Sequence, residues 1–370
     1  MGQASPERAR ASQGPLFSCF SPKCGHIPSV EKNAPSRAIV LPTDTPELFQ
    51  AAVSRAVELL RAGEVVALPT ETVYGLAANA LDARAVARIF EVKGRPAHNP
   101  VIVHVASVDM ARECVEHWPA LAQKLAASFW PGPLTLVLPR AANIPPAVTA
   151  GGPTVGVRWP NHPLIQAVIQ ACNFPLAAPS ANLATRVSPT CARHVREQLG
   201  TRIPLIIDGG PSPVGIESAV LDISVSPPRL LRPGMIHEQA LVSVTGELAQ
   251  GGGEGATVLR SPGLLRKHYA PQARLVVWPW HDDQDLRTRL AEGHMPAART
   301  HILAHTRIPA GAGLGHVSIL PRNGQAFARS IYAALHQCDE AGAEWIVVEA
   351  LPEGGEWNAI ADRLGRAAAS

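Results

Sequence analysis

With 370 residues, of which 46% are hydrophobic and 17% charged, the chain is too long for one average domain and can bury two cores. A formal net charge of +3 and the lack of a polybasic run exclude a protein that coats nucleic acid. No apolar run reaches the roughly 20 residues that span a bilayer, and Met1–Phe20 has no apolar segment of a secretory signal. We therefore expect a soluble, cytoplasmic protein with no membrane partner.

The six cysteines are scattered along a chain without an export signal, so we expect reduced thiols. Cys19, Cys24 and His26 lie close together in the sequence, but they lack the second pair of ligands that closes a zinc site. We predict no metal site in the protein.

The first predicted elements follow a leader of residues 1–38, which has no apolar periodicity and is expected to be disordered. Apolar spacing then predicts an α/β domain over residues 39–236, with an element order too irregular for a plain doubly wound sheet. We expect a twisted sheet of mixed parallel and antiparallel strands with flanking helices. The predicted helices are 48–61, 83–91, 108–127, 163–171 and 190–198, and the predicted strands are 64–68, 101–105, 135–138, 155–158, 176–178, 205–207 and 218–223.

Residues 237–272 contain a glycine cluster at 251–255 and no strong periodicity, which is typical of a linker. Over residues 273–370 strands and helices alternate again, at a spacing that favours a small parallel α/β domain. Its predicted strands are 274–278, 301–304 and 345–348, and its predicted helices are 285–291, 325–338 and 358–368.

Polar side chains gather where predicted strands end, which is where α/β proteins place ligand sites. The segment 68–76 puts Thr70, Glu71, Thr72 and Tyr74 directly after a strand. This pattern indicates either a ligand site or a turn in which a threonine caps the next helix.

A second group lies in a loop broken by Gly and Pro, where Lys93 and Arg95 are one residue apart. Arginine offers a planar fork and lysine a point charge, so the loop could clamp phosphates, or it could be an exposed basic loop. His104 ends the next strand and either orients a carboxylate or is a histidine with its partners inside the fold.

A third group starts with Arg158, which ends a strand, and an arginine there is costly without a carboxylate or phosphate partner. The turn with Ser180 and Asn182, followed by Ser188, combines small residues with hydroxyl and amide groups that can bind sugar or phosphate oxygens. Taken singly, each of these segments can also be explained as an ordinary turn or helix cap.

The chain contains no Walker A sequence, no G-x-G-x-x-G, no Ser-His-Asp order and no metal-ligand pair. Any nucleotide must therefore lie in a cradle of another kind, and a hydrolase is disfavoured. Two further turns, in 207–220 and 231–234, again join Gly or Pro to polar groups.

Taken in order, PTETVYGL, KGRPAHNP, VHV, GPLTLVL, TVGVRWP, APSANL, SPT, IDGG, GIESAV and LRPG closely resemble the YrdC-like threonylcarbamoyl-AMP synthase family over residues 51–234. The segment SPGLLRKHYAP at 261–271 and the tail resemble the long, two-domain form of that family. The resemblance implies a YrdC-like catalytic domain and a Rossmann-like C-terminal domain.

The resemblance also implies a nucleotidyltransferase that joins L-threonine, bicarbonate and ATP into threonylcarbamoyl-AMP and releases pyrophosphate. Mg²⁺ is expected to enter with ATP. A tRNA-threonylcarbamoyl transferase system would use the product to form threonylcarbamoyl-adenosine in tRNA, and we expect at most a weak contact of this chain with tRNA.

Carried over motif by motif, the resemblance assigns Lys93 and Arg95 to catalysis, with Lys93 facing the phosphates, and Asn182 to the family signature. The residues that it places around threonine are Thr72, His104, Arg158, Ala178 and Ser218. The residues that it places around ATP are Arg95, Asn99, Thr154, Ser180, Ser188, Arg232 and, as a lid, Tyr269.

Three other functions compete with this one. An RNA-binding module should interleave aromatic with basic residues, yet aromatic residues make up only 5% of the chain. A carbamoyltransferase of the related, larger kind should carry zinc-finger cysteine pairs. A degenerate domain that binds nucleotide without turnover should have lost some of the signature cations, which are all present.

Overall fold

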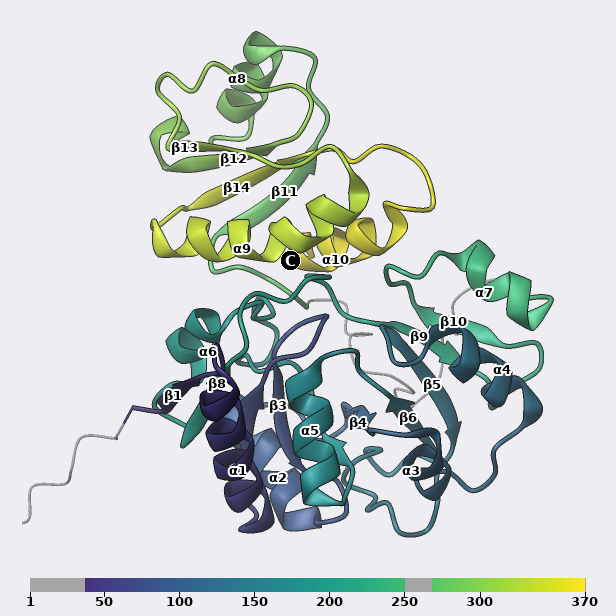
Figure 1. Ribbon diagram of the computed structural model, residues 1–370. Coiled ribbons are helices and arrows are strands. Elements are labelled where there is room, and N and C mark those ends of the chain that lie inside the picture. The colour runs from purple at the N-terminus through teal and green to yellow at the C-terminus, as the bar shows by residue number, and fades with distance from the viewer. Residues whose placement is uncertain (1–36, 250–267, 370) are drawn as a thin grey trace, which may run out of the picture. The chain divides into compact units, whose positions relative to one another are not determined.

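The computed structural model describes residues 37–249 and 268–369 (Figure 1). Nearly all of the predicted leader and the glycine-rich part of the predicted linker lie outside the described residues. The described residues belong to one compact unit that begins at Pro35. Within them, no helix combines the length and the apolar character needed to cross a membrane.

Ten of the described strands form one large sheet in the order β1-β8-β2-β3-β7-β4-β6-β5-β9-β10. They are β1 (Ile39–Pro42), β2 (Val66–Leu68), β3 (Gly75–Asn79), β4 (Val103–His104), β5 (Leu134–Pro139), β6 (Thr154–Arg158), β7 (Leu176–Ala177), β8 (Leu205–Asp208), β9 (Ala219–Asp222) and β10 (Arg229–Arg232). The helices of this part are α1 (Pro46–Arg61), α2 (Ala83–Lys93), α3 (Val108–Glu113), α4 (Ala120–Phe129), α5 (Pro163–Cys172), α6 (Ala192–Leu199) and α7 (Glu238–Thr245).

The large sheet is mixed. Strand β8 runs parallel to β1 and β2, whereas β3 is antiparallel to both β2 and β7. Strands β4 and β6 are parallel, and their register sets His104 directly opposite Arg158. The central strands thus bring the ends of segments 66–68, 103–104, 154–158 and 176–177 together.

The two faces of the large sheet are covered by different helices, as alternation along a strand requires. In β8, Leu205 and Ile207 join a core with α1 and α5, whereas Ile206 joins the core that includes α2 and α6. Helix α1 fits this role because its buried residues recur at helical spacing, Thr45 caps its start and Pro46 occupies its first turn.

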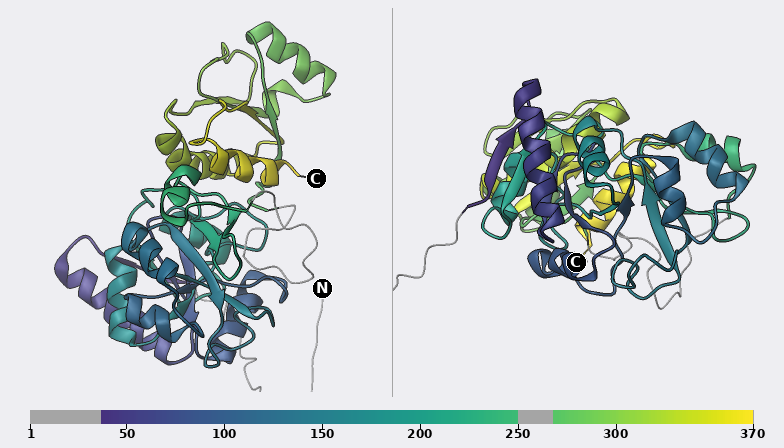
Figure 2. Two further views of the ribbon diagram at one scale, coloured as in Figure 1. Left: turned by 90° about the vertical axis from the view of Figure 1, so that its right-hand side faces the viewer. Right: turned by 60° about the horizontal axis from the view of Figure 1, so that its bottom comes forward.

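A second sheet holds the strands β11 (Arg274–Trp278), β12 (Thr300–Ala304), β13 (His316–Ile319) and β14 (Trp345–Glu349) in the order β11-β14-β12-β13, all of them parallel. Its helices are α8 (Asp283–Glu292), α9 (Gly324–Glu340) and α10 (Asn358–Ala368), with the short 3-10 helix η1 (Ala297–Arg299). Figures 1 and 2 show α8 on one face of this sheet and α9 and α10 on the other. The side chains of β14 alternate between these two faces: Val347 packs with α8, whereas its neighbours Ile346 and Val348 pack with α9 and α10.

The predicted fold class, a mixed α/β domain followed by a small parallel α/β domain, is confirmed. The prediction of one helix over 108–127 is wrong, since Pro119 separates α3 from α4 and a proline cannot continue a helix. Helix α7 was not expected, yet it begins inside the segment predicted as a linker and buries Leu241 in the core.

The sequence patterns also missed β1, β3, β10 and β13. Strand β3 reads Gly-Leu-Ala-Ala-Asn and lacks the β-branched and aromatic residues that mark a strand. Its partners on both sides, β2 and β7, impose the extended conformation instead.

Candidate active site

A cavity lined mainly by buried side chains lies where these strand ends meet; about 50 Å³ of it accommodates the centres of water-sized molecules. It is lined from the loop after β2, the ends of β4 and β6, the turn after β7, the segments before β9 and at the end of β10, and residues 268–269. The predicted site residues that line it are Thr72, His104, Arg158, Ala178, Ser218, Arg95, Ser180, Arg232 and Tyr269. Residues predicted to bind threonine and residues predicted to bind ATP thus line the same cavity.

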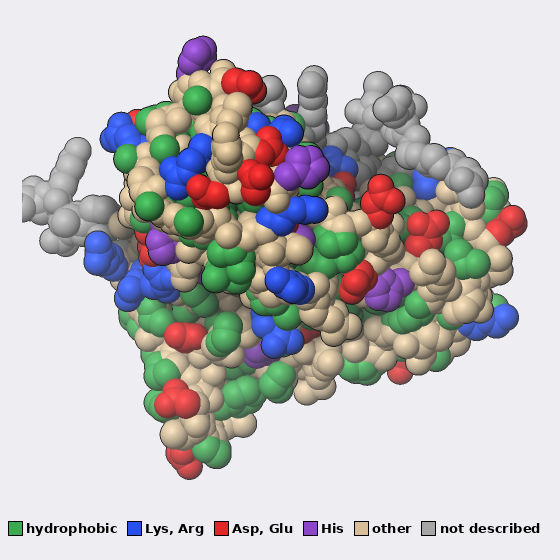
Figure 3. All heavy atoms as spheres, turned by 90° about the horizontal axis from the view of Figure 1, so that it is seen from above, with side chains coloured by type: hydrophobic (Ala, Val, Ile, Leu, Met, Phe, Trp, Pro, Cys, Tyr) green, Lys and Arg blue, Asp and Glu red, His purple; other side chains and the backbone are tan. Residues whose placement is uncertain are grey.

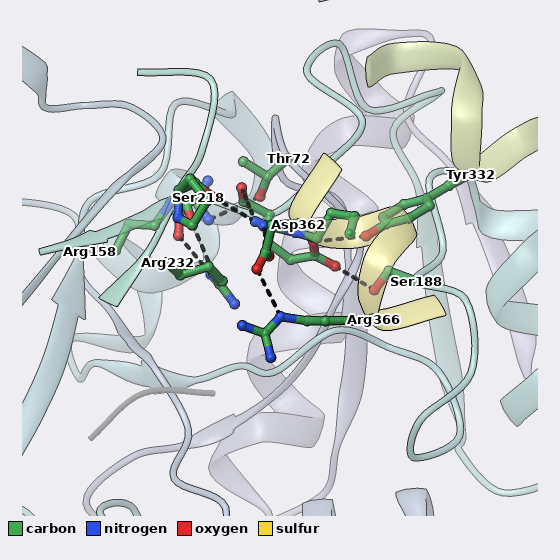
Figure 4. A network of polar contacts seen from close by, with 11 residues as sticks. Thr72, Arg158, Ser188, Ser218, Arg232, Tyr332, Asp362 and Arg366 are labelled. Carbon is green, nitrogen blue, oxygen red and sulfur yellow. Dashed lines mark hydrogen bonds and ion pairs between the residues drawn. The ribbon is translucent and has the colours of Figure 1, made fainter. Parts of the chain in front are cut away.

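Arg158 is held by three groups of the protein itself. Its Nη1 donates to Thr72 Oγ1 over 2.9 Å, a pair seen in Figure 4, and its Nε donates to the Gly132 carbonyl over 3.3 Å. Its Nη2 lies 2.7 Å from Glu71 Oε1, an ion pair between two side chains that are at most 5% exposed. The carboxylate that the sequence required for Arg158 is therefore present inside the fold, and it fixes the guanidinium at the wall of the cavity.

The loop after β2 is shaped by hydroxyl groups. Thr70 Oγ1 donates to the Val73 carbonyl over 2.6 Å and accepts from the Thr72 and Val73 amides. The Thr72 hydroxyl lies 2.9 Å from Thr70 Oγ1, and since Thr70 donates elsewhere, Thr72 donates to it. The turn that orders this backbone also places Thr72 in the cavity. The alternative, that a threonine caps the next helix, is wrong, because the element that follows is the strand β3.

His104 lines the cavity beside Arg158 and is buried. Burial, helped by the charge of Arg158, lowers the pKa of its imidazole to about 3, so the ring is neutral near pH 7. Its Nδ1 has no hydrogen-bond partner among the described residues. A neutral imidazole with one open nitrogen can bind a polar ligand atom in this cavity.

This lowered pKa predicts an acid-sensitive fold. Between the folded value of about 3 and the ordinary value of 6.5, the unfolded chain binds more protons, so the free energy of unfolding falls as the pH falls through that window. We expect the Tm to drop when the pH goes from about 7.5 to about 5, and the His104→Asn substitution to make that drop smaller by a few degrees. Thermal unfolding followed by circular dichroism measures both.

The exposed His117 provides the matched control, since His117→Asn should keep the full pH dependence. His268, whose pKa burial also lowers to about 3, should account for part of the drop that remains in His104→Asn. An identical pH dependence in the wild type and His104→Asn would contradict this assignment.

Ser218 and Arg232 lie at the same wall, and Figure 4 shows their contact. Arg232 Nε donates to the Ser218 carbonyl over 3.0 Å and its Nη2 to Ser218 Oγ over 3.2 Å. The Ser218 hydroxyl also lies 2.9 Å from that of Thr135 in β5. Strand β9 pairs with both β5 and β10, which is why these three residues meet.

Arg95 is held by main-chain carbonyl groups. Its Nε donates to the Asn99 carbonyl over 3.1 Å and its Nη2 to that of Pro100 over 2.8 Å. Burial and the charge of Arg232 lower its pKa to about 10, despite an opposing influence of Tyr269, so the side chain remains a cation at neutral pH. Its position in the loop follows from Gly94, which ends α2 in the left-handed conformation at φ 60°.

Lys93 has surroundings that the sequence did not suggest. Its ammonium donates to the carbonyl groups of Ser180 and Asn182 and lies 3.2 Å from Asn182 Oδ1. The side chain is 2% exposed and does not line the cavity, and burial holds its pKa well below the usual range. Here Lys93 secures the turn that carries Ser180, and its direct approach to phosphates stays a prediction.

The other predicted residues do not line the cavity. Asn182 Nδ2 donates to the Arg186 carbonyl over 2.7 Å, and Ser188 Oγ donates to Glu217 Oε1 over 2.6 Å. Asn99 is buried and Thr154 lies in β6, and neither lines the cavity. Their predicted contacts with ATP stay predictions.

Tyr269 closes the cavity next to His268. It is 1% exposed, has a left-handed φ of 61°, and its hydroxyl has no hydrogen-bond partner among the described residues. His268 is also buried, and its Nδ1 has no such partner either. Two buried polar atoms without partners, in residues that line the cavity, favour a polar ligand there.

Sequence reasoning assigned no role to Glu71, Thr135, Glu217 or His268. Glu71 and Glu217 stood inside quoted motifs, and a buried arginine such as Arg158 is a signal that some carboxylate must lie near it. Nothing in the sequence indicated which carboxylate, because that depends on how the strands pair.

The comparisons with known proteins agree with this arrangement. Residues 58–234 match the family described as "Telomere recombination", and residues 235–369 match the family described as "Threonylcarbamoyl-AMP synthase, C-terminal domain". Proteins named threonylcarbamoyl-AMP synthase are similar to this chain in Pyrococcus abyssi, with 39% identity over 84% of this chain and 92% of the relative, and in Bacillus subtilis, with 40% identity over 89% and 94%.

A solved structure is similar as well. Pyrococcus abyssi Sua5 complexed with L-threonine matches with a TM-score of 0.81 and 37% identity over 90% of this chain and 97% of that one. The matches extend across both sheets and include the cavity and the residues that line it. The chain belongs to the threonylcarbamoyl-AMP synthase family.

Proposed function

We propose that this chain is a nucleotidyltransferase that makes threonylcarbamoyl-AMP from L-threonine, bicarbonate and ATP. Bicarbonate takes up a proton and yields carbon dioxide and water, and the threonine amine adds to the carbon dioxide and loses a proton to give a carbamate. A carbamate oxygen attacks the α-phosphorus of ATP, the bond to the pyrophosphate oxygen breaks, and pyrophosphate leaves.

The observation that carries the proposal is a buried cavity lined by three arginine side chains, Arg95, Arg158 and Arg232. Groups of the protein hold each guanidinium at the cavity wall, and cations fixed in this way suit the oxygen atoms of a triphosphate and of an amino-acid carboxylate. The relatives' shared name and the threonine complex of the similar structure support threonine as the amino acid.

The substrates divide the cavity between them. Arg158, held by Thr72 and Glu71, offers guanidinium N–H groups to the threonine carboxylate, with Thr72, His104, Ala178 and Ser218 around that molecule. Arg95, Ser180 and Arg232 face the nucleotide, and Tyr269 covers it. We also assign Asn99, Thr154 and Ser188 to the nucleotide, although none of the three lines the cavity.

The reaction requires the protein to position the substrates and to stabilise negative charge. The carbamate is itself the nucleophile, so no side chain has to form a covalent intermediate, and the cations stabilise charge on the oxygens of the phosphoryl group in transfer. Tyr269 excludes water from the carbamate and from the mixed anhydride, both of which water destroys.

Mg²⁺ belongs to the substrate in this proposal. No group of three or more His, Cys, Asp or Glu side chains that could hold a metal is found in ranges 37–249 and 268–369, and Glu71 and Glu217 are already paired with arginines. The ion therefore enters as MgATP, held by phosphate oxygens.

The product is an activated acyl group, which a tRNA-threonylcarbamoyl transferase system would use to modify an adenosine of tRNA. We place the reaction in the cytoplasm, where ATP, bicarbonate and tRNA occur together. We expect at most a weak contact of the chain with tRNA itself; on the one face shown in Figure 3, basic and acidic side chains are interspersed.

Pyrophosphate release by the purified full-length protein tests the proposal. We expect release from MgATP to require both L-threonine and bicarbonate, and a product with the mass of threonylcarbamoyl-AMP to appear in equal amount. Assays with serine, with alanine and without an amino acid are the controls. Equal release in all of them would refute the proposed function.

A further inference from the structure

The cavity wall is tied to the C-terminal helices through one buried carboxylate, Glu217. Its Oε1 accepts from the Ser188 hydroxyl over 2.6 Å. Its Oε2 accepts from Tyr332 of α9 over 3.0 Å and from Arg363 Nε of α10 over 2.9 Å. Figure 4 shows Ser188 and Tyr332 directed toward the same carboxylate from different parts of the chain.

Arg363 also binds two main-chain segments at this wall of the cavity. Its Nη2 donates to the Glu217 carbonyl over 3.2 Å and to the Pro233 carbonyl over 3.0 Å. Glu217 directly precedes Ser218 and Pro233 directly follows Arg232, and both Ser218 and Arg232 line the cavity. One guanidinium therefore bridges the segment before β9 and the end of β10, which the pairing of these strands brings together.

The same two C-terminal side chains confine Tyr269. The guanidinium of Arg363 lies 5.4 Å from the centre of the Tyr269 ring, and the Tyr332 ring stacks with it at 6.1 Å. Because the Tyr269 hydroxyl has no hydrogen-bond partner among the described residues, the ring is held by these two contacts and by the edge contact with His268 at 4.0 Å.

The loop that carries Glu217 is built to fit α9. A Cβ atom at Gly215, which has a φ of 87°, would collide with Cα of Arg329, so only glycine lets the loop approach the helix this closely. Arg329 Nε then donates to the Pro213 carbonyl over 2.7 Å.

Charge keeps the cluster intact at neutral pH. Burial by itself would raise the pKa of Glu217, but Arg363, Arg232 and the Ser188 hydroxyl outweigh it and the pKa is lowered. Glu217, Tyr332 and Arg363 are at most 7% exposed. An ion pair this deeply buried adds little net stability but specifies one geometry, since any other arrangement leaves a charge without its partner.

We infer that Arg363 and Tyr332 are positioning residues for the proposed reaction: through Glu217 and Tyr269 they orient Ser188, Arg232 and the Tyr269 hydroxyl around the nucleotide. The inference rests on the proposed function, and it gives the C-terminal helices a direct part in binding ATP. If the contacts of Tyr332 and Arg363 served only to attach α9 and α10, they would not have to end on residues of the cavity wall.

The test uses the full chain with Tyr332→Phe, which removes a single oxygen atom, and Arg363→Met, which removes the guanidinium. A displacement of about 1 Å can cost about 10²-fold in turnover, so we expect Arg363→Met to lower kcat/KM for ATP by about 100-fold and Tyr332→Phe by about 3- to 10-fold. The KM for threonine should change much less, and Arg363→Lys should recover part of the loss. Equilibrium binding of a non-hydrolysable ATP analogue should weaken in the same order.

A matched control loosens the same helix elsewhere. The exposed Arg193 of α6 forms an ion pair with Glu340 of α9, 2.5 Å away, and neither residue lines the cavity. Glu340→Gln should leave both kcat and the affinity for the ATP analogue unchanged. Combining Tyr332→Phe with Ser188→Ala should cost less than the sum of the two single effects, because both hydroxyls act on Glu217.

Each outcome decides something. If Tyr332→Phe and Arg363→Met bind the ATP analogue and turn over as the wild type does, or if Glu340→Gln is equally impaired, the positioning inference is overturned. If the KM for threonine rises and that for ATP does not, it is overturned as well. A wild-type protein that binds the analogue but releases no pyrophosphate in response to threonine sinks the proposed function, whereas the binding comparison still judges the positioning roles.

Discussion

Arg158→Ala should lower kcat/KM for threonine by about 100-fold or more while the KM for ATP stays within about three-fold of the wild type. The guanidinium is the cation at the threonine end of the cavity, and Thr72, Gly132 and Glu71 hold it in place. A carboxylate that loses such a fixed donor keeps its desolvation cost and gains nothing in return. Pyrophosphate release at varied threonine and saturating ATP measures the effect.

Stability has to be separated from binding in this experiment. Arg158→Ala leaves Glu71 as a buried charge without its partner, which costs about 3–5 kcal/mol of unfolding free energy. Adding Glu71→Gln removes that charge, so the double variant should regain much of the lost Tm without regaining threonine use. If threonine use returns together with the Tm, or if ATP use is lost instead, Arg158 does not bind the threonine carboxylate.

Arg95→Ala should have the complementary effect, a fall of about 100-fold in kcat/KM for ATP with little change in the KM for threonine. The carbonyl groups of Asn99 and Pro100 fix the side chain, and it remains charged at neutral pH, so its field is available to phosphate oxygens. Pyrophosphate release at varied ATP and saturating threonine gives the two constants.

Arg88 is a suitable control for Arg95 because it lies on the same segment, in α2, and is 44% exposed, paired with Glu64. Arg88→Ala should leave both KM values as they are. Arg95→Lys keeps the charge but loses the planar fork, so it should recover only part of the ATP use. A rise in the KM for threonine alone would reverse our division of the cavity.

Much of the fold could be predicted from residue patterns. Strands such as β11 and helices such as α10 were predicted with the bounds that the structure has, because both carry strong apolar periodicity. Elements without that signal, among them β3 with its alanines and the short β10, form because neighbouring strands and burial compensate for weak local preference.

The sequence predicted many of the residues that line the site, but not which groups they contact. Turn chemistry and strand ends pointed to Thr72, Arg95 and Arg158, and the structure brings all three to one cavity. For Lys93 the residue type suggested phosphate, whereas the folded chain turns its ammonium to the carbonyl groups of Ser180 and Asn182.

The sequence by itself determined the family, the α/β class and the local turns that present polar groups at strand ends, because short motifs encode local backbone geometry and side-chain type. Only the tertiary structure decided which of these groups are partners. Glu71 meets Arg158 because β4 and β6 bring their ends beside the loop after β2. Glu217 meets Arg363, which stands 146 residues further along the chain, because α10 packs beside the segment that carries Glu217. Such pairs depend on strand order and helix packing, and the energy of burying a charge then makes each pairing specific.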